Sequence, residues 1–160
     1  MRALVLSHAY LDPANRGKLR ALAGQGVSVT AAVPGGSTGE DGGVRLAPIP
    51  ATGDPADPAA LDWNRRALKK LLSDFRPDVV QIEEEPGTRV AATTSAEAAR
   101  LGIPVVLFSW ESLPRRRGFW QRRRAATSFN AARAAIGGNA LAAELLSAEI
   151  GGKPVVVLPQ

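Results

Sequence analysis

Hydrophobic residues along the chain form short runs, which alternate with longer segments where apolar positions recur at helical spacing. The short runs predict β-strands at residues 2–8, 27–33, 44–50, 79–82, 103–110, 134–138 and 153–159. The longer segments predict helices at residues 15–26, 57–75, 86–102, 119–133 and 139–152. The second helix, which Asp57 and Pro58 are expected to open, carries a stripe typical of a buried face: Leu61, Leu68, Leu71, Leu72 and Phe75. Residues 34–43, rich in glycine, predict a loop.

Strands and helices alternate, and the strands are too far apart along the chain to form hairpins. The predicted fold class is therefore α/β: an open parallel sheet of about six to seven strands, with helices on both faces, in a Rossmann-like arrangement. At 160 residues the chain fits one domain, 1–160. Ligands of such sheets bind beyond the carboxyl ends of the strands, so the residues that follow each strand are the candidate site.

The first strand is followed by His8 and then by Asn15, Arg16 and Gly17 at the start of a helix. Neither GxGxxG nor GxxxxGK[ST] occurs, so a dinucleotide fingerprint and a Walker loop are excluded. Backbone amides at the helix start could bind an anion or a sugar hydroxyl, but an ordinary helix cap explains the same residues. With one histidine and no cysteine, no metal site and no disulfide are expected.

Carboxylates follow two later strands. Alternation along a strand places Glu84 on the face opposite Glu83 and Glu85. These glutamates either bind sugar hydroxyls or a partner loop, or one of them caps the next helix. Trp110 and Glu111 end the 103–110 strand; an aromatic ring beside a carboxylate suits a sugar, and a tryptophan is equally common in a plain core.

The order and spacing of these segments resemble the N-terminal domain of glycosyltransferases of the GT-B fold, in their family 4-like retaining group. Residues 13–33, PANRGKLRALAGQGVSVTAAV, resemble the family's glycine-containing loop, helix and second strand. Residues 76–86, RPDVVQIEEEP, resemble its PDVVHxHxxE segment, and residues 134–160 resemble the close of that domain. The resemblance covers nearly the whole chain. Two departures are Gln81 and Glu83, which stand where the family often has histidine.

The resemblance implies that the chain binds the acceptor, a sugar or a lipid, and that a C-terminal donor-binding domain is absent from residues 1–160. That domain would bind a UDP- or GDP-sugar, so no cofactor is expected here, and the isolated chain is expected to be inactive. No catalytic residue is assigned. By analogy the residues that line the acceptor side of a cleft are His8, Asn15, Arg16, Gly17, Glu84, Glu85, Trp110 and Glu111.

A different class of function also fits, namely a free-standing Rossmann-like binding or interaction module without transferase activity. A receiver-type signalling domain fits less well, because it needs acidic residues after the first strand, where Ser7 and His8 stand.

Residues 115–124, RRRGFWQRRR, concentrate the positive charge of the chain. The net charge is +5, from 20 Lys and Arg against 15 Asp and Glu, so the six arginines of this segment account for all of the excess. Side chains 122–124 span about 200° of a helix and cannot all face one partner. The segment comprises Arg115, Arg116, Arg117, Phe119, Trp120, Arg122, Arg123 and Arg124.

We interpret this basic and aromatic segment first as a contact with an anionic membrane surface. A solvated face with the aromatic rings in the core is the main alternative, and a site for a phosphorylated acceptor is the next. Nucleic acid is not expected as a partner, because the charge is local and no nucleic-acid-binding motif accompanies it. Since no apolar run reaches about 18 residues and no signal-peptide cleavage site follows the first strand, we expect a cytoplasmic protein, peripheral at the inner face of the membrane.

Overall fold

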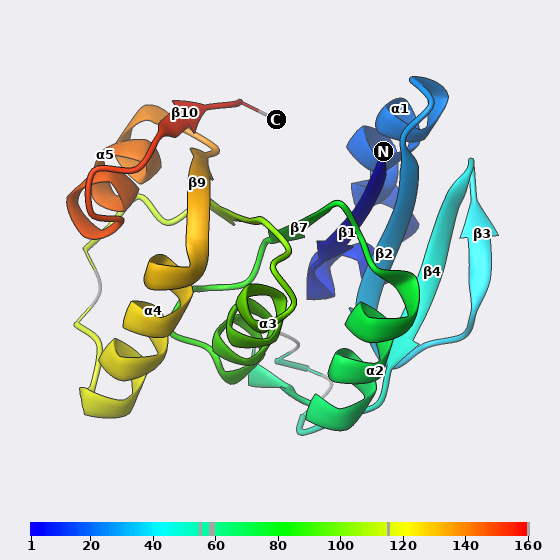
Figure 1. Ribbon diagram of the computed structural model, residues 1–160, viewed down its shortest axis with the longest axis horizontal. Helices are drawn as coiled ribbons and strands as arrows, with labels where there is room; N and C mark the ends of the chain where they lie inside the picture. The colour runs from blue at the N-terminus through cyan, green and yellow to red at the C-terminus, as the bar shows by residue number, and fades with distance from the viewer. Residues whose placement is uncertain (55, 58–59, 115, 160) are drawn as a thin grey trace. The chain divides into compact units, whose positions relative to one another are not determined.

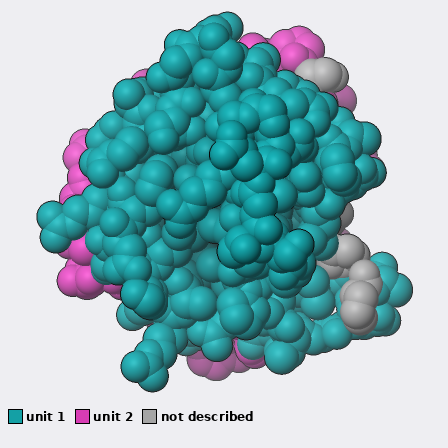
Figure 2. Space-filling view, turned by 90° about the vertical axis from the view of Figure 1, so that its right-hand side faces the viewer, with its two compact units in different colours: residues 1–80 teal, residues 81–160 magenta. Residues whose placement is uncertain are grey.

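The structure is a computed structural model that describes residues 1–54, 56–57, 60–114 and 116–159. The chain divides into two compact units, Met1–Val80 and Gln81–Gln160, which are coloured separately in Figure 2. Figure 1 shows the elements of both units along the chain. Strand β7 (Val79–Ile82) crosses the division, and the two units are described in turn.

Unit 1 contains three parallel strands, β1 (Arg2–Leu6), β2 (Ser28–Pro34) and β4 (Val44–Ile49). The short strand β3 (Gly39–Asp41) pairs with β4 in the antiparallel direction, so the order within the unit is β1-β2-β4-β3. Two 3-10 turns, η1 (His8–Leu11) and η2 (Pro13–Arg16), connect β1 to the helix α1 (Gly17–Gly24).

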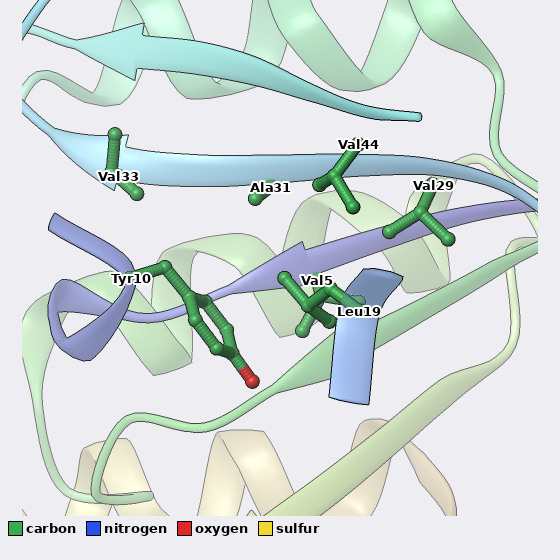
Figure 3. Close-up of a cluster of buried hydrophobic side chains, with 7 residues drawn as sticks. All are labelled: Val5, Tyr10, Leu19, Val29, Ala31, Val33 and Val44. Carbon is green, nitrogen blue, oxygen red and sulfur yellow. The ribbon is translucent and has the colours of Figure 1, made fainter. Parts of the chain in front are cut away.

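The core of unit 1 forms where β1, β2 and β4 meet the first helical segments. Figure 3 shows Tyr10 of η1 and Leu19 of α1 beside the apolar side chains of the three strands. These side chains lie almost fully out of water, and such burial stabilises a fold by about 25 cal/mol per Å2 of apolar surface. The cluster comprises Val5, Tyr10, Leu19, Val29, Ala31, Val33 and Val44.

Unit 2 contains the parallel strands β8 (Val105–Ser109), β9 (Ala132–Gly137) and β10 (Val155–Val157), in the order β8-β9-β10. Its helices are α3 (Arg89–Arg100), α4 (Phe119–Ala131) and α5 (Ala140–Glu149). Helix α5 packs along β9 and β10, and α3 and α4 pack against each other, as Figure 1 also shows. All three helices contact β8, which explains why four of its five residues are buried.

The predicted fold class, α/β with mostly parallel strands in a Rossmann-like arrangement, is confirmed, but two details were wrong. Apart from a separate two-stranded pair described below, the described residues contain eight strands where about six to seven were predicted. These are β1, β2, β3, β4, β7, β8, β9 and β10. The added strand is β3, inside the predicted loop 34–43: two glycines with positive φ, Gly42 and Gly43, turn the chain back so that it pairs with β4.

The second error concerns the start of the helix predicted at 57–75. Helix α2 begins at Arg65 and ends at Phe75, because β5 (Ala51–Thr52) and β6 (Asp62–Trp63) pair as a small hairpin that keeps the preceding residues extended. The cap is the Asn64 side chain, which accepts a hydrogen bond from the Ala67 amide at 2.9 Å. Asp57 therefore does not cap the helix, Leu61 is not part of its stripe, and Pro58 lies outside the described residues.

Candidate functional site

The candidates of unit 1 lie on the connection between β1 and α1. His8 begins η1 directly after β1 and is half-buried. Asn15 is exposed, and its amide Nδ2 donates a hydrogen bond to the carbonyl oxygen of Ala9 at 2.9 Å. Gly17 is exposed, has an ordinary helical φ of −52°, and a Cβ placed on it would meet no other atom within 4 Å. Neither its backbone nor its packing in this chain therefore requires glycine.

Arg16 differs from its neighbours because it is buried, with 8% of its surface exposed. Its guanidinium donates hydrogen bonds to the carbonyl oxygens of Tyr10, at 2.7 Å, and Leu11, at 3.0 Å. It also pairs with Asp41 of β3 at 3.1 Å, and Arg20 pairs with the same carboxylate at 3.1 Å. These contacts tie the loop to β3, and a ligand contact from Arg16 stays a prediction.

The carboxylate of Asp41 is therefore enclosed by two arginines. Hydrogen bonds from Arg16 and Arg20 hold the pKa of Asp41 below the ordinary aspartate value of 3.8. Asp41 is thus ionised at neutral pH and fixes the buried guanidinium of Arg16, a pairing that no pattern in the sequence predicts.

Some of the candidates of unit 2 line a cavity of about 100 Å3, whereas Glu84 and Trp110 are not among its lining residues. Two of the predicted residues, Glu85 and Glu111, line it together with Ser109 at the end of β8. The Ser109 hydroxyl oxygen accepts a hydrogen bond from the Glu111 amide at 3.0 Å and lies 3.5 Å from a carboxylate oxygen of Glu85. The complete lining is Glu85, Pro86, Ser109, Glu111, Leu113, Pro114, Arg117, Ala142, Leu145, Leu146 and Glu149.

The three glutamates after β7 have different surroundings. Glu84 is buried, whereas Glu83 and Glu85 are half-buried, although β7 ends at Ile82 and the three glutamates lie beyond the strand. The Gln81 side chain donates a hydrogen bond to Glu83 at 2.5 Å. The idea that a glutamate caps the next helix is wrong: the cap of α3 is Thr88, whose hydroxyl accepts from the Ala91 amide at 3.2 Å. A ligand contact from Glu84 stays a prediction.

Trp110 directly follows Ser109, and its side chain is about half exposed, at 48%. Its ring contacts Phe108 edge to face, with the ring centroids 5.4 Å apart. It also lies on Gly138: a Cβ there would be 2.3 Å from a carbon of the indole ring. The next residue, Asn139, caps α5 through a bond from the Ala142 amide at 2.8 Å.

The basic segment is divided in the structure between an exposed part and an anchored residue. Arg116, Phe119, Trp120, Arg122 and Arg123 are exposed, and we call these five residues the basic-aromatic patch. Within it, the Phe119 and Trp120 rings meet edge to face at 5.2 Å, and the Arg123 guanidinium lies 5.1 Å from the centre of the Phe119 ring.

The other arginines of the segment behave differently. Arg117 forms an ion pair with Glu149 and lies 5.7 Å from the centre of the Phe129 ring, so it anchors its loop to α5 and lines the cavity. Arg124 is half-buried, which agrees with the predicted spread of side chains 122–124 around a helix. Arg115 lies outside the described residues.

In the parts of the chain that the structure describes, no helix is long and apolar enough to cross a bilayer. The same residues contain no group of three or more His, Cys, Asp or Glu side chains that could hold a metal ion.

Several solved structures resemble this fold. UDP-GlcNAc 2-epimerase from Neisseria meningitidis, solved with UDP-GlcNAc bound, shares 12% identity over 98% of this chain and 45% of that chain, with a TM-score of 0.62. UGT73P12 from Glycyrrhiza uralensis, solved with glycyrrhetinic acid 3-O-monoglucuronide, shares 14% identity over 99% of this chain and 49% of that chain, with a TM-score of 0.59. The SsfS6 glycosyltransferase from Streptomyces sp. SF2575 shares 16% identity over 100% of this chain and 50% of that chain, with a TM-score of 0.51.

These likenesses identify the class of fold: an N-terminal domain of the GT-B type. The family follows from the sequence itself, since the model of the glycosyl transferase 4-like domain matches residues 14–159. The chain belongs to this family. No protein of curated function matches the sequence. The chain spans about half the length of the solved structures that it resembles.

Proposed function

We propose that the chain is the acceptor-binding half of a retaining glycosyltransferase, which moves a sugar from a UDP- or GDP-sugar to a sugar or lipid acceptor. A C-terminal domain, the partner of this half, binds the donor. Family membership over residues 14–159 supports glycosyl transfer as the class of reaction and does not favour a binding module without a transferase role. The observation that carries the acceptor assignment is the cavity where Glu85, Ser109 and Glu111 lie together.

The chemistry of this cavity suits an alcohol. Carboxylates accept hydrogen bonds from hydroxyl groups, and bonds to an ionised acceptor are shorter and stronger than neutral ones. The Ser109 hydroxyl contacts the carboxylate of Glu85 and the backbone amide of Glu111, so it links these two residues. A cavity of about 100 Å3 is smaller than a typical ligand pocket, so it holds one hydroxylated end of the acceptor and leaves the rest outside.

In this proposal the residues of the cavity bind and orient the acceptor, and none is assigned as the catalytic base. Retention of configuration depends on the donor and its phosphate groups, which the other domain holds. Unit 1 contributes a second surface, made of His8, Asn15 and Gly17, for a hydroxyl or an anionic group of the substrates. The open space beyond Gly17 supports this role, because a substrate can approach its backbone closely there.

The acceptor assignment is tested by NMR titration of the 15N-labelled chain. Candidate saccharide acceptors, UDP-glucose and GDP-mannose are added separately. We expect the acceptor to shift amide signals in residues 83–86 and 109–117, and the nucleotide-sugars to leave them in place. Glu85→Gln with Glu111→Gln should abolish the shifts, whereas Glu144→Gln, on the exposed part of α5, should not change them. Shifts caused by the nucleotide-sugars alone would contradict the assignment.

We also propose that the basic-aromatic patch contacts an anionic membrane, which places the protein at the cytoplasmic face. The exposure of Phe119 and Trp120, at 55% and 67%, favours this over the alternative with both rings in the core. Aromatic rings suit the headgroup region, and each arginine near an anionic surface contributes about 1 kcal/mol. The anchored residue Arg117 has a different role, because Glu149 already neutralises it.

Membrane contact is tested by sedimentation with vesicles of phosphatidylcholine that contain an anionic lipid. Binding should require the anionic lipid and weaken as salt is added. Arg122→Ser with Arg123→Ser should reduce binding at least tenfold, and Arg65→Ser with Arg66→Ser, on exposed positions of α2, serves as the control. Equal binding by the two double variants would contradict the proposal.

A further inference from the structure

Trp110 is held against the backbone of Gly138 in a way that leaves room for a ligand. A Cβ built on Gly138 would lie 2.3 Å, 2.5 Å and 2.5 Å from three neighbouring carbons of the six-membered indole ring, Cε3, Cδ2 and Cζ3. Approach to the edge of a ring brings one atom close and leaves its two neighbours much farther away. The three distances are almost equal, so the Cβ would sit over the ring, and one face of Trp110 rests on Gly138.

Trp110 remains 48% exposed although Gly138 covers one ring face and Phe108 contacts the ring, so part of the residue stays open to solvent. The edge-to-face contact with Phe108 and the bond from the Asn139 side chain to the Trp110 carbonyl, at 3.5 Å, support the position from two sides. Trp110 is therefore a supported, flat and partly open aromatic surface rather than a loosely placed side chain.

The neighbours of Trp110 in sequence indicate what such a surface would bind. Ser109 and Glu111, on either side of it in the sequence, both line the cavity that we propose as the acceptor site, although Trp110 itself is not one of the lining residues. A pyranose ring has the matching chemistry, because its C–H bonds form an apolar face that stacks on an aromatic ring while its hydroxyls donate to carboxylates. An open-chain polyol offers the same hydroxyls without that face.

We propose that Trp110, supported by Gly138, is a stacking platform for a pyranose ring of the acceptor, with Gly138 as its positioning residue. This inference rests on the proposed acceptor site and adds the class of ligand: a cyclic sugar rather than a simple alcohol or an open-chain polyol. Gly138 is required because any side chain would displace the ring from the place where it stacks. No backbone strain is involved, since Gly138 does not have a positive φ in the structure.

The test uses NMR of the 15N-labelled chain, followed at the indole N–H signals of its three tryptophans and at the backbone amides. The Trp110 signal is assigned with Trp110→Phe. Methyl β-D-glucopyranoside and methyl α-D-mannopyranoside are titrated as probes, and sorbitol is the open-chain control. We expect at least one pyranoside to shift the Trp110 indole signal and the amides of residues 109–111, and sorbitol to leave the indole signal unchanged.

Variants separate the platform from the cavity. Gly138→Ala should weaken pyranoside binding about three- to tenfold, as should Trp110→Ala, while Trp110→Phe should retain part of the affinity. Gly24→Ala, at a site where a Cβ meets nothing within 4 Å, is the matched control and should bind as the parent does. Circular dichroism confirms that each variant is folded.

The outcomes distinguish this inference from the proposed function. Amide shifts around Glu85 and Glu111 with an unchanged Trp110 indole signal would overturn the platform and keep the acceptor site. Equal responses to sorbitol and the pyranosides would also overturn the platform, because no ring face is then needed. If the pyranosides shift neither the cavity nor Trp110, the platform is overturned, and the acceptor of the proposed function is not a pyranoside.

Discussion

Arg16→Met offers a direct test of what holds the loop between β1 and α1. Methionine keeps an apolar stem of similar length and removes the guanidinium, so the carbonyl groups of Tyr10 and Leu11 lose their Arg16 donor, and Asp41 keeps Arg20 as a donor. A hydrogen bond from a charged donor contributes about 1.5–3 kcal/mol when buried, as at Tyr10, and the two partly exposed contacts add less. We expect the free energy of unfolding to fall by about 3 kcal/mol.

The assay is urea unfolding followed by circular dichroism, with Arg20→Met as the matched control. Arg20 pairs with the same carboxylate, but 40% of its side chain is exposed, so its loss should cost less than about 1 kcal/mol. If Arg16→Met and Arg20→Met destabilise the chain equally, the burial of Arg16 does not hold this loop, and a ligand-binding role for Arg16 gains weight.

Three further predictions concern stability. Because the pKa of Asp41 is lowered in the folded chain, the pairing of Asp41 stabilises the fold above pH 3.8, and this stabilisation is lost as the pH falls through the folded pKa. The urea midpoints of the parent and Asp41→Asn should therefore differ at neutral pH and converge in acid. A difference that stays constant with pH would refute this. Gly137→Ala should lower the free energy of unfolding by about 1–3 kcal/mol, because the added Cβ would lie 2.4 Å from the Ala143 amide nitrogen. Thermal unfolding measures this loss, with Gly24→Ala as the control. Equal melting temperatures of the two variants would count against close packing of Gly137 on Ala143. Asn139→Ala should lower the free energy of unfolding by about 1 kcal/mol, because α5 loses its cap. Asn130→Ala, at an exposed position near the end of α4, should lower it by almost nothing. Urea titration compares the two variants, and similar losses of stability would contradict the capping role.

The hydrophobic pattern was sufficient to predict the parallel strands, because each strand is a short apolar run bounded by turn residues. It failed where pairing depends on a distant segment. Strand β3 has no apolar run, since its residues are Gly39, Glu40 and Asp41; it exists because the turn at residues 42–43 brings it back onto β4. The predicted start of α2 was wrong for a similar reason, since residues 62–63 pair with β5 instead of joining the helix.

The candidate site was predictable in part from the rule that ligands bind beyond strand ends. The rule pointed to Glu85 and Glu111, and the structure places both on one cavity, while their binding role stays a prediction. Ser109 was missed because a serine at the end of an apolar strand carries no distinct signal. Glu149 and Gly138 were missed because their roles depend on contacts with Arg117 and Trp110, which lie far from them along the chain.

We propose that the cavity lined by Glu85, Ser109 and Glu111 binds the acceptor of a glycosyl transfer reaction. This role is tested by the rate of sugar transfer from a labelled nucleotide-sugar, measured with the chain joined to the proposed donor-binding domain and compared between Glu111→Gln and Glu144→Gln. We expect Glu111→Gln to raise the KM for the acceptor at least tenfold and to leave the KM for the donor unchanged, and Glu144→Gln to change neither. An unchanged acceptor KM in Glu111→Gln, or an effect on the donor KM alone, would contradict it.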